Sequence, residues 1–144
     1  VICDQAPEKP ELPMRFFRWS PEVEAAELAS FDIGLAPLHR DAWTRGKCGM
    51  KLLRYLGAGI PAIASPVGSQ LEILKQGGGL SSQMDSWELA VSRLLDEAGL
   101  RQRLRQRGFA LMHQRYSLDR VADLWDSLLR GLVRSGTQAK LNLV

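Results

Sequence analysis

The chain has 144 residues, the length of one ordinary domain, and 45% of them are hydrophobic and 24% charged. These proportions supply enough apolar material for a core and exclude a wholly disordered chain. The net charge of +3 suits a phosphate-bearing ligand but falls short of the basic footprint of nucleic-acid-binding proteins. Cys3 and Cys48 stand far apart in the sequence without clustered histidines, so we expect neither a disulfide framework nor a metal site. This cysteine usage predicts a reducing compartment. No apolar run approaches the roughly 20 residues that cross a bilayer, and we therefore expect a cytoplasmic protein.

Strand and helix patterns alternate up to residue 82. The chain opens directly on an apolar strand-like run, Val1–Asp4, and a loop with three prolines, Gln5–Pro13, follows it. Ser20 and Pro21 suit the N-cap and first position of a helix, and Glu22 and Glu24 suit the positive end of its dipole. The expected strands are Val1–Asp4, Met14–Trp19, Phe31–Leu38, Pro61–Ser65 and a short edge strand at Leu80–Ser82, and the expected helices are Ser20–Ser30, Gly49–Ala58 and Gln70–Lys75.

Phe31–Leu38 is a nearly continuous apolar run, which is typical of a strand buried on both faces of a parallel sheet. The polar and basic segment that follows it, His39–Lys47, is predicted to form a loop. Alternating strands and helices indicate an α/β fold with a doubly wound parallel sheet and right-handed crossovers. Ligands of such sheets bind at the carboxyl ends of the strands, which here are the segments after Trp19, Leu38 and Ser65.

Beyond residue 84 the pattern is helical. Asp85 and Glu88 have the spacing of a capping box before a helix that carries Trp87 and Leu94 on its apolar side. We expect two more helices, over Leu100–Gln114 and after Ser117, and a tail from Ser135 to Val144 without strong periodicity.

The segment from Leu38 to Glu72 carries the most specific chemistry. A buried strand is followed by a basic loop, and a helix begins within Gly46-Lys47-Cys48-Gly49. The free N–H groups and the dipole of that helix would face the ligand edge of the sheet, where glycines permit a close approach and Lys47 and Lys51 add charge. The pattern therefore favours a phosphate or pyrophosphate ligand.

The run FDIGLAPL…W…GKCGMKLLRYLGAGIPAIASPVGSQLEIL resembles the C-terminal, donor-binding domain of group 1 glycosyltransferases of the GT-B fold. These are bacterial enzymes that transfer sugars from nucleotide-sugar donors, including enzymes of cell-envelope polysaccharide biosynthesis. The resemblance covers nearly the whole chain and is most specific over Lys51–Ser65. It implies a Rossmann-like donor-binding domain over residues 1–134, truncated at its N-terminus, and a tail over residues 135–144.

The resemblance also implies roles for single residues. Gly46 stands where many members have the first of two glutamates, and Arg54 stands at the second, which binds ribose. Glutamate accepts hydrogen bonds from two ribose hydroxyls, whereas arginine can only donate, so ribose recognition must change or be lost. The other donor-binding positions are Lys47, Cys48 and Gly49 in the loop, and Met50, Lys51 and Leu52 through their backbone N–H groups.

Four further residues are candidates for base or sugar contacts. Arg18 and Trp19 follow a strand where family members bind the base, although Trp19 fits equally well as a buried packing residue before Pro21. His39 ends a strand at the expected ligand edge. Glu72 opens a helix, where complementing the helix dipole explains it equally well.

Family members carry an N-terminal acceptor-binding domain, and a strand, a Gly-Arg…Lys-Gly loop and a helix precede the strand that matches Val1–Asp4. We therefore expect this chain to be part of a longer retaining glycosyltransferase that moves a sugar from a nucleotide-diphosphate sugar to a glycan, lipid or other acceptor. We expect the chain to be inactive alone and to need no cofactor or metal besides the donor. The alternative is a degenerate nucleotide- or protein-binding module without transferase activity, which Arg54 favours.

The expected partners are the nucleotide sugar and the N-terminal domain, and not nucleic acid. A run of alternating arginines most simply forms a solvated helix surface, and the alternative is peripheral contact with anionic lipid on the inner face of the membrane. The arginines of this run are Arg101, Arg103, Arg105 and Arg107.

Overall fold

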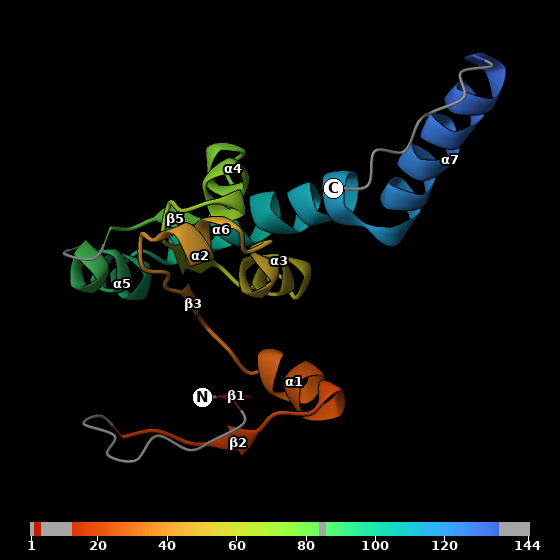
Figure 1. Ribbon diagram of the computed structural model, residues 1–144. Helices are drawn as coiled ribbons and strands as arrows, with labels where there is room; N and C mark the ends of the chain where they lie inside the picture. Colours follow the sequence, from red (N-terminus) through yellow and green to blue (C-terminus); the bar gives the residue numbers. More distant parts are fainter. Residues whose placement is uncertain (1, 4–12, 84–85, 136–144) are drawn as a thin grey trace.

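Short parallel strands and longer helices form a mixed α/β fold in the computed structural model, which describes residues 2–3, 13–83 and 86–135 (Figure 1). The strands are β1 (Ile2–Cys3), β2 (Phe17–Arg18), β3 (Gly34–Ala36), β4 (Ala62–Ala64) and β5 (Leu80–Ser81). The helices are α1 (Pro21–Leu28), α2 (Ala42–Arg45), α3 (Met50–Gly57), α4 (Ser69–Lys75), α5 (Trp87–Asp96), α6 (Ala98–Leu111), the π-helical turn η2 (Met112–Tyr116) and α7 (Leu118–Ser135).

The strands form two parallel sheets. β1 pairs with β2, and β3, β4 and β5 form a three-stranded sheet with β4 in the centre. Gly34 pairs with Ala62 and Ile63 pairs with Leu80 in the larger sheet. The prediction of a parallel sheet with alternating helices is therefore confirmed, but the described strands do not join into the single doubly wound sheet that the sequence predicts.

The predicted start of the first helix is confirmed. Ser20 is the N-cap of α1, and its Oγ accepts a hydrogen bond from the backbone N–H of Val23 at 3.2 Å. Pro21 occupies the first helical position, where its missing N–H costs no hydrogen bond. This cap fixes the direction in which α1 leaves β2.

Helix α3 packs closely on one face of the larger sheet. Leu52 and Leu56 are fully buried in a cluster with the small residues Ala36, Ala62 and Ala64 of the two strands. Gly34 allows the closest approach, because a Cβ atom there would lie 2.5 Å from Cγ of Tyr55. The small side chains of β3 and β4 therefore fix the position of α3 over the sheet.

The opposite face of β4 is covered by α5 and α6. Ile63 is fully buried in a second cluster with Ala90, Leu94 and Leu104. Helix α6 also reaches the first cluster, because Gly108 lies against Leu56, where a Cβ atom would be 2.6 Å from Cδ2 of the leucine. The central strand is therefore buried on both faces.

Some predicted boundaries are wrong. The predicted strand Phe31–Leu38 is reduced to β3, with Leu35 at 44% exposure, because β3 pairs on one side only among the described strands. The predicted loop His39–Lys47 contains α2, because Asp41 and Thr44 form a capping box. The capping residue Asp85 and the tail beyond Ser135 lie outside the described residues.

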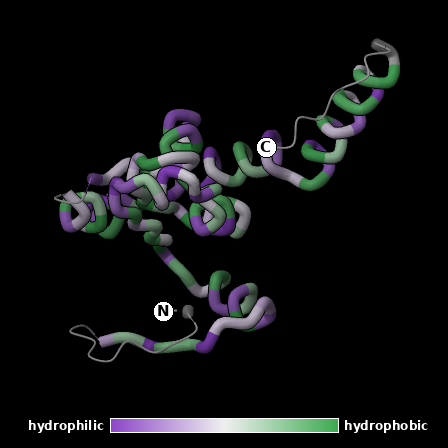
Figure 2. The backbone as a smooth tube through the Cα atoms, viewed as in Figure 1, coloured by the Kyte–Doolittle hydropathy of each residue, from purple (hydrophilic) through white to green (hydrophobic). Residues whose placement is uncertain are grey.

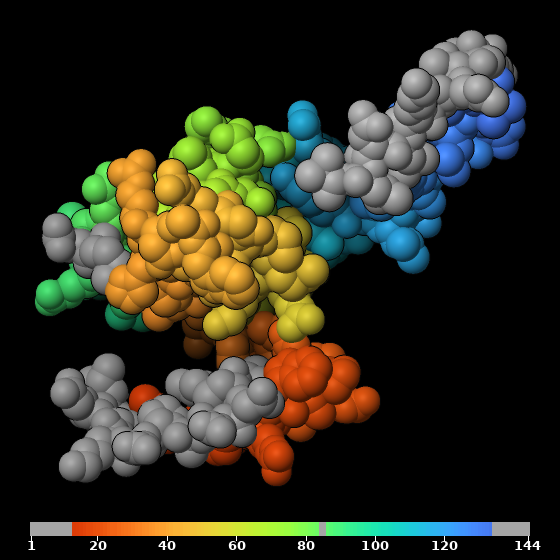
Figure 3. Space-filling model, viewed as in Figure 1, coloured from red at the N-terminus to blue at the C-terminus, as the bar shows by residue number. Residues whose placement is uncertain are grey.

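Helix α7 extends away from the body of the molecule (Figures 1 and 3). Its apolar residues, which give the green segments that alternate with white and purple along α7 in Figure 2, are exposed. Examples are Leu118 at 83%, Trp125 at 60% and Leu128 at 54%. These three side chains therefore lie largely in solvent.

We predict that Leu52→Ala lowers the free energy of unfolding by about 2–5 kcal/mol, because it removes a fully buried side chain and leaves a cavity under α3. Trp125→Ala is the matched control, and its exposed side chain should change that free energy by no more than about 0.5 kcal/mol. Urea unfolding followed by circular dichroism measures both values. A loss at Trp125 as large as that at Leu52 would show that α7 packs on the body in solution.

Candidate functional site

A cavity of about 520 Å³ lies at the carboxyl end of β3 and the amino end of α3. This is the edge of a parallel sheet at which ligands of α/β proteins bind. Its lining residues are Ala36, Pro37, Leu38, Gln70 and the whole of residues 46–51. We refer to it below as the loop cavity.

The loop that lines this cavity is held by α2 and by Gly68. The backbone N–H of Thr44 donates to Oδ1 of Asp41 at 2.7 Å, and that hydrogen bond is the main cause of the lowered pKa of Asp41. The carbonyl of Arg45 then lies so close to Gly68 that a Cβ atom at Gly68 would be 2.5 Å from its oxygen. Gly68 also has a φ of +53°, which favours glycine. The segments that follow β3 and β4 therefore pack against each other beside the loop cavity.

Helix α3 begins at this cavity from Gly49, which has a φ of +71°. Leu53 is the first residue whose N–H donates within the helix, to the carbonyl of Gly49 at 3.2 Å. The N–H groups of the preceding turn have no intrahelical acceptor, as at any helix start, and carry the positive end of the dipole. Lys47, which precedes this turn, and Lys51, which lies within it, are both exposed. The cavity therefore offers N–H donors and cationic side chains to an anion.

Buried polar groups behind the loop cavity connect the two strands. The backbone N–H of Leu38 donates to Oγ of Ser65 at 3.0 Å. With its amide nitrogen turned toward the strands, Gln70 donates to the carbonyls of Ser65 at 2.9 Å and Ala36 at 3.2 Å. Gln70 lines the cavity and was not predicted as a site residue. Its position in the first turn of a helix after a buried strand is the signal that could have identified it.

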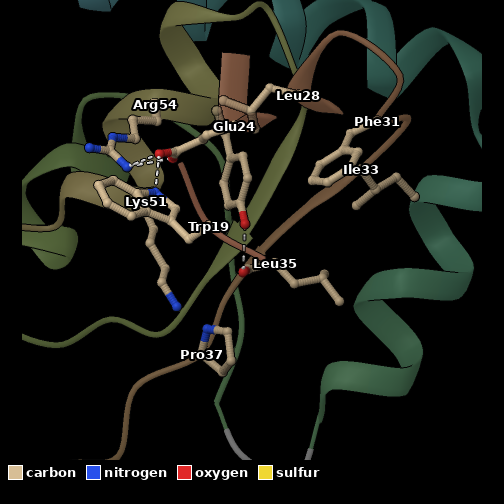
Figure 4. Close-up of a pocket in the computed structure, with 10 residues that line it drawn as sticks. Trp19, Glu24, Leu28, Phe31, Ile33, Leu35, Pro37, Lys51 and Arg54 are labelled. Atoms are coloured by element: carbon tan, nitrogen blue, oxygen red, sulfur yellow. Dashed lines mark hydrogen bonds and ion pairs between the residues drawn. The ribbon is translucent and has the colours of Figure 1, made fainter. Parts of the chain in front are cut away.

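A second cavity, of about 530 Å³, lies between α1, β3 and α3 (Figure 4). We call it the helix cavity. Charged and polar side chains line one part of it and apolar side chains line the other, as Figure 4 shows. Its lining residues are Trp19, Glu24, Lys51 and Arg54 in the polar part, and Leu28, Phe31, Ile33, Leu35, Pro37 and Tyr55 in the rest.

Glu24 is the centre of the polar part. Its carboxylate accepts hydrogen bonds from Nη1 of Arg54 at both oxygens, and Nε1 of Trp19 donates to Oε2 at 2.8 Å. Burial alone would raise the pKa of Glu24. The hydrogen bonds from Trp19 and Arg54, with the charges of Arg54 and Lys51, outweigh burial and hold the pKa below its ordinary value. Glu24 therefore stays ionised beside two cations.

Tyr55 closes the apolar part of the helix cavity. Its hydroxyl donates to the carbonyl of Leu35 at 3.3 Å, at the edge of β3 with which no described strand pairs. Burial of the ring, with a smaller contribution from the negative charge of Glu24, raises the pKa of Tyr55. The phenol therefore remains protonated and serves as a donor.

The structure brings most of the predicted site residues together in two groups. Six of them, Gly46, Lys47, Cys48, Gly49, Met50 and Lys51, line the loop cavity. Trp19 and Arg54 line the helix cavity, and Lys51 and Pro37 line both. Trp19 is 46% exposed, so it is not the buried packing residue of the alternative interpretation.

Four predicted residues lie apart from these linings. The side chain of Leu52 is buried in the core, so only its backbone N–H remains available. Arg18 is exposed on β2 and lines neither cavity. His39 is exposed, and its carbonyl accepts a hydrogen bond from Oγ1 of Thr44. Glu72 is exposed on α4, where its Oε1 lies 3.0 Å from Nζ of Lys75.

Glu24 is a second lining residue that the sequence interpretation missed, because its place in the first turn of α1 was explained by the helix dipole. The unexpected arginine at position 54 was the available signal, since a cation facing a cavity calls for a carboxylate nearby.

Arg101 also differs from the predicted solvated face, because its Nη1 donates to the carbonyls of Leu94 and Leu95 at 2.6 and 2.8 Å. Arg101 therefore supplies hydrogen-bond donors to backbone carbonyls in the last turn of α5.

Comparisons with protein-family models, with curated proteins and with solved structures find no match to this chain. Within residues 2–3, 13–83 and 86–135, no three His, Cys, Asp or Glu side chains gather as a metal site would require. None of the helices described is both long and apolar enough to cross a membrane.

We predict that acid destabilises the wild-type fold more than it destabilises Glu24→Gln. The pKa of Glu24 lies below its ordinary value of 4.5 in the folded chain, so its ionised form stabilises the fold at higher pH. That contribution is lost as the pH falls through the folded pKa. Thermal unfolding measured from about pH 6 to about pH 3 should therefore show a smaller fall in Tm for the variant.

Glu27→Gln is the matched control for this experiment, since Glu27 lies one turn later on the same helix and lines neither cavity. Its Tm profile should follow the wild type. Equal acid sensitivity in wild type and Glu24→Gln would contradict the role assigned to the Glu24 carboxylate.

Proposed function

We propose that this chain is the donor-binding domain of a retaining glycosyltransferase that uses a nucleotide-diphosphate sugar. The observation that carries the proposal is the loop cavity, in which residues 46–51 bring a helix start, two lysines and two glycines to the carboxyl end of a parallel strand. A diphosphate is the ligand whose charge and oxygen acceptors match these donors best. The resemblance of residues 31–74 to group 1 glycosyltransferases supplies the reaction.

The chemistry follows from where negative charge develops. In sugar transfer the bond from the sugar carbon to the diphosphate oxygen breaks, a bond from that carbon to the acceptor's hydroxyl oxygen forms, and the hydroxyl proton is released. The leaving nucleotide diphosphate gains negative charge as its bond breaks. Fixed N–H dipoles at the start of α3 and the ammonium group of Lys47 would stabilise that charge without reorganising. Lys51, which lines both cavities, would neutralise part of the negative charge on the leaving diphosphate.

The proposed fold is one doubly wound sheet, and the order of the strands supports it. Among the described strands the order is β2-β1 in one sheet and β3-β4-β5 in the other, all parallel. A further parallel strand between β1 and β3, preceding them in the chain, would give the order 3-2-1-4-5-6 of dinucleotide-binding folds. The apolar part of the helix cavity, along the edge of β3 that the described strands leave open, offers packing to such a strand. We propose that the N-terminal part of the full enzyme supplies it.

The second candidate is a module that binds a nucleotide without transferring sugar. The pairing of Arg54 with Glu24 favours it, because α3 presents a cation where the enzymes of the family have their ribose-binding carboxylate. Slow release of nucleoside diphosphate from a nucleotide sugar by the full-length protein distinguishes the two candidates. Release supports the transferase, and binding without any turnover supports the binding module.

We predict that Lys47→Ala weakens binding of a nucleoside diphosphate to the full-length protein by about 10- to 100-fold, which is the value of one hydrogen bond to a charged group. Isothermal titration calorimetry with UDP, GDP and inorganic pyrophosphate measures the loss. Pyrophosphate should respond to the substitution as the nucleotides do, because Lys47 would contact the phosphates.

Lys75→Ala is the matched control, since Lys75 is an exposed lysine on α4 that lines neither cavity and pairs with Glu72. Its affinities should equal those of the wild type. Failure of all the nucleotides and of pyrophosphate to bind, or equal affinities in wild type and Lys47→Ala, would contradict the proposed function.

A further inference from the structure

The carboxylate of Glu24 is held in one position, and the described residues fill only part of its hydrogen-bond acceptor positions. Its side chain is 17% exposed, and it lies between Arg54 on α3 and Trp19, which precedes α1. Each carboxylate oxygen can accept two hydrogen bonds. Oε2 accepts from Trp19 and Arg54, whereas Oε1 accepts from Arg54 alone among the described residues. One acceptor position on Oε1 therefore remains for a ligand.

Arg54 also retains donor capacity. Its guanidinium has five N–H donors, and the hydrogen bonds to Glu24 come from Nη1. The side chain is 44% exposed and lines the same cavity as the carboxylate. A free acceptor and free donors therefore lie next to each other on two helices.

A vicinal diol matches this arrangement. Each hydroxyl has one O–H donor and two acceptor lone pairs, so one hydroxyl of the pair can donate to Glu24 while its neighbour accepts from Arg54. The indole of Trp19, half exposed and tied to Glu24 through Nε1, adds an aromatic surface beside the diol. A fully ionised phosphate group has no O–H donor, so it would not use the free acceptor position on Glu24.

The helix cavity and the loop cavity are neighbours that share part of their lining. Pro37 and Lys51 line both of them, so a ligand in one cavity lies next to the other. In such a ligand the diol faces Glu24 and Arg54, and the anionic group faces residues 46–51. A ribonucleoside diphosphate has both groups in one molecule.

We propose that Glu24, positioned by Arg54 and Trp19, accepts a hydrogen bond from a ribose hydroxyl of the nucleotide whose diphosphate lies at residues 46–51. This inference rests on the proposed function and names the group that recognises the ribose. Helix α3 has an arginine at position 54 and therefore no acceptor there for a ribose hydroxyl. In this proposal the carboxylate of Glu24 on α1 supplies that acceptor.

The test compares UDP with 2′,3′-dideoxy-UDP, and GDP with 2′,3′-dideoxy-GDP, on the full-length wild type and on Glu24→Gln, by calorimetry. We expect the wild type to prefer each ribose form by about 10- to 100-fold, the value of a hydrogen bond to a charged group. Glu24→Gln should lose most of that preference, and its affinity for inorganic pyrophosphate should equal that of the wild type. Glu27→Gln should retain the preference.

The outcomes separate the inference from the proposed function. Equal affinity of wild type for ribose and dideoxy forms overturns the inference, and does so without any variant that could misfold. Nucleotide and pyrophosphate binding that Lys47→Ala weakens would in that case leave the proposed function standing. Absence of all nucleotide and pyrophosphate binding overturns both.

Discussion

The close packing of α3 on β3 and β4 is the constraint on which the rest of the structure depends. Leu52 and Leu56 fill the space over small strand residues, and the ring of Tyr55 lies where a Cβ atom at Gly34 would be. A larger residue at Gly34 would push the helix outward and move its first turn away from the strand ends. The same packing that stabilises the core therefore sets the position of the helix start, and with it the loop cavity.

The sequence predicts the parts of this architecture that depend on local chemistry. The Ser20 and Pro21 cap, the buried strand at β4 and the helix start at Gly49 all follow from short patterns, and the structure has each of them. Strand lengths could not be predicted as well, because β3 ends where its pairing with β4 ends and not where its apolar run ends. The separation into two sheets likewise depends on which strands are neighbours, and local periodicity carries no information about that.

The candidate site shows the same division. Residues 46–51 are contiguous, so a sequence pattern could place all six at one cavity. The contact between Glu24 and Arg54 joins residues 30 positions apart on two helices, and it depends on where α1 lies relative to α3. It explains why an arginine is tolerated at a position facing a cavity, since its charge is balanced and its hydrogen-bonding direction is fixed by a carboxylate. The two cavities, which share Lys51, are thereby parts of one arrangement of donors and acceptors.

The central claim is that one nucleotide occupies both cavities, and amide NMR during titration with UDP and GDP tests it most directly. The account predicts the largest chemical-shift changes at the backbone N–H groups of residues 47–52 and, in the same titration, at the indole N–H of Trp19. Inorganic pyrophosphate should move the first group and leave the indole signal in place. Largest changes on α5, α6 or α7, or an indole signal that no nucleotide moves, would contradict the account.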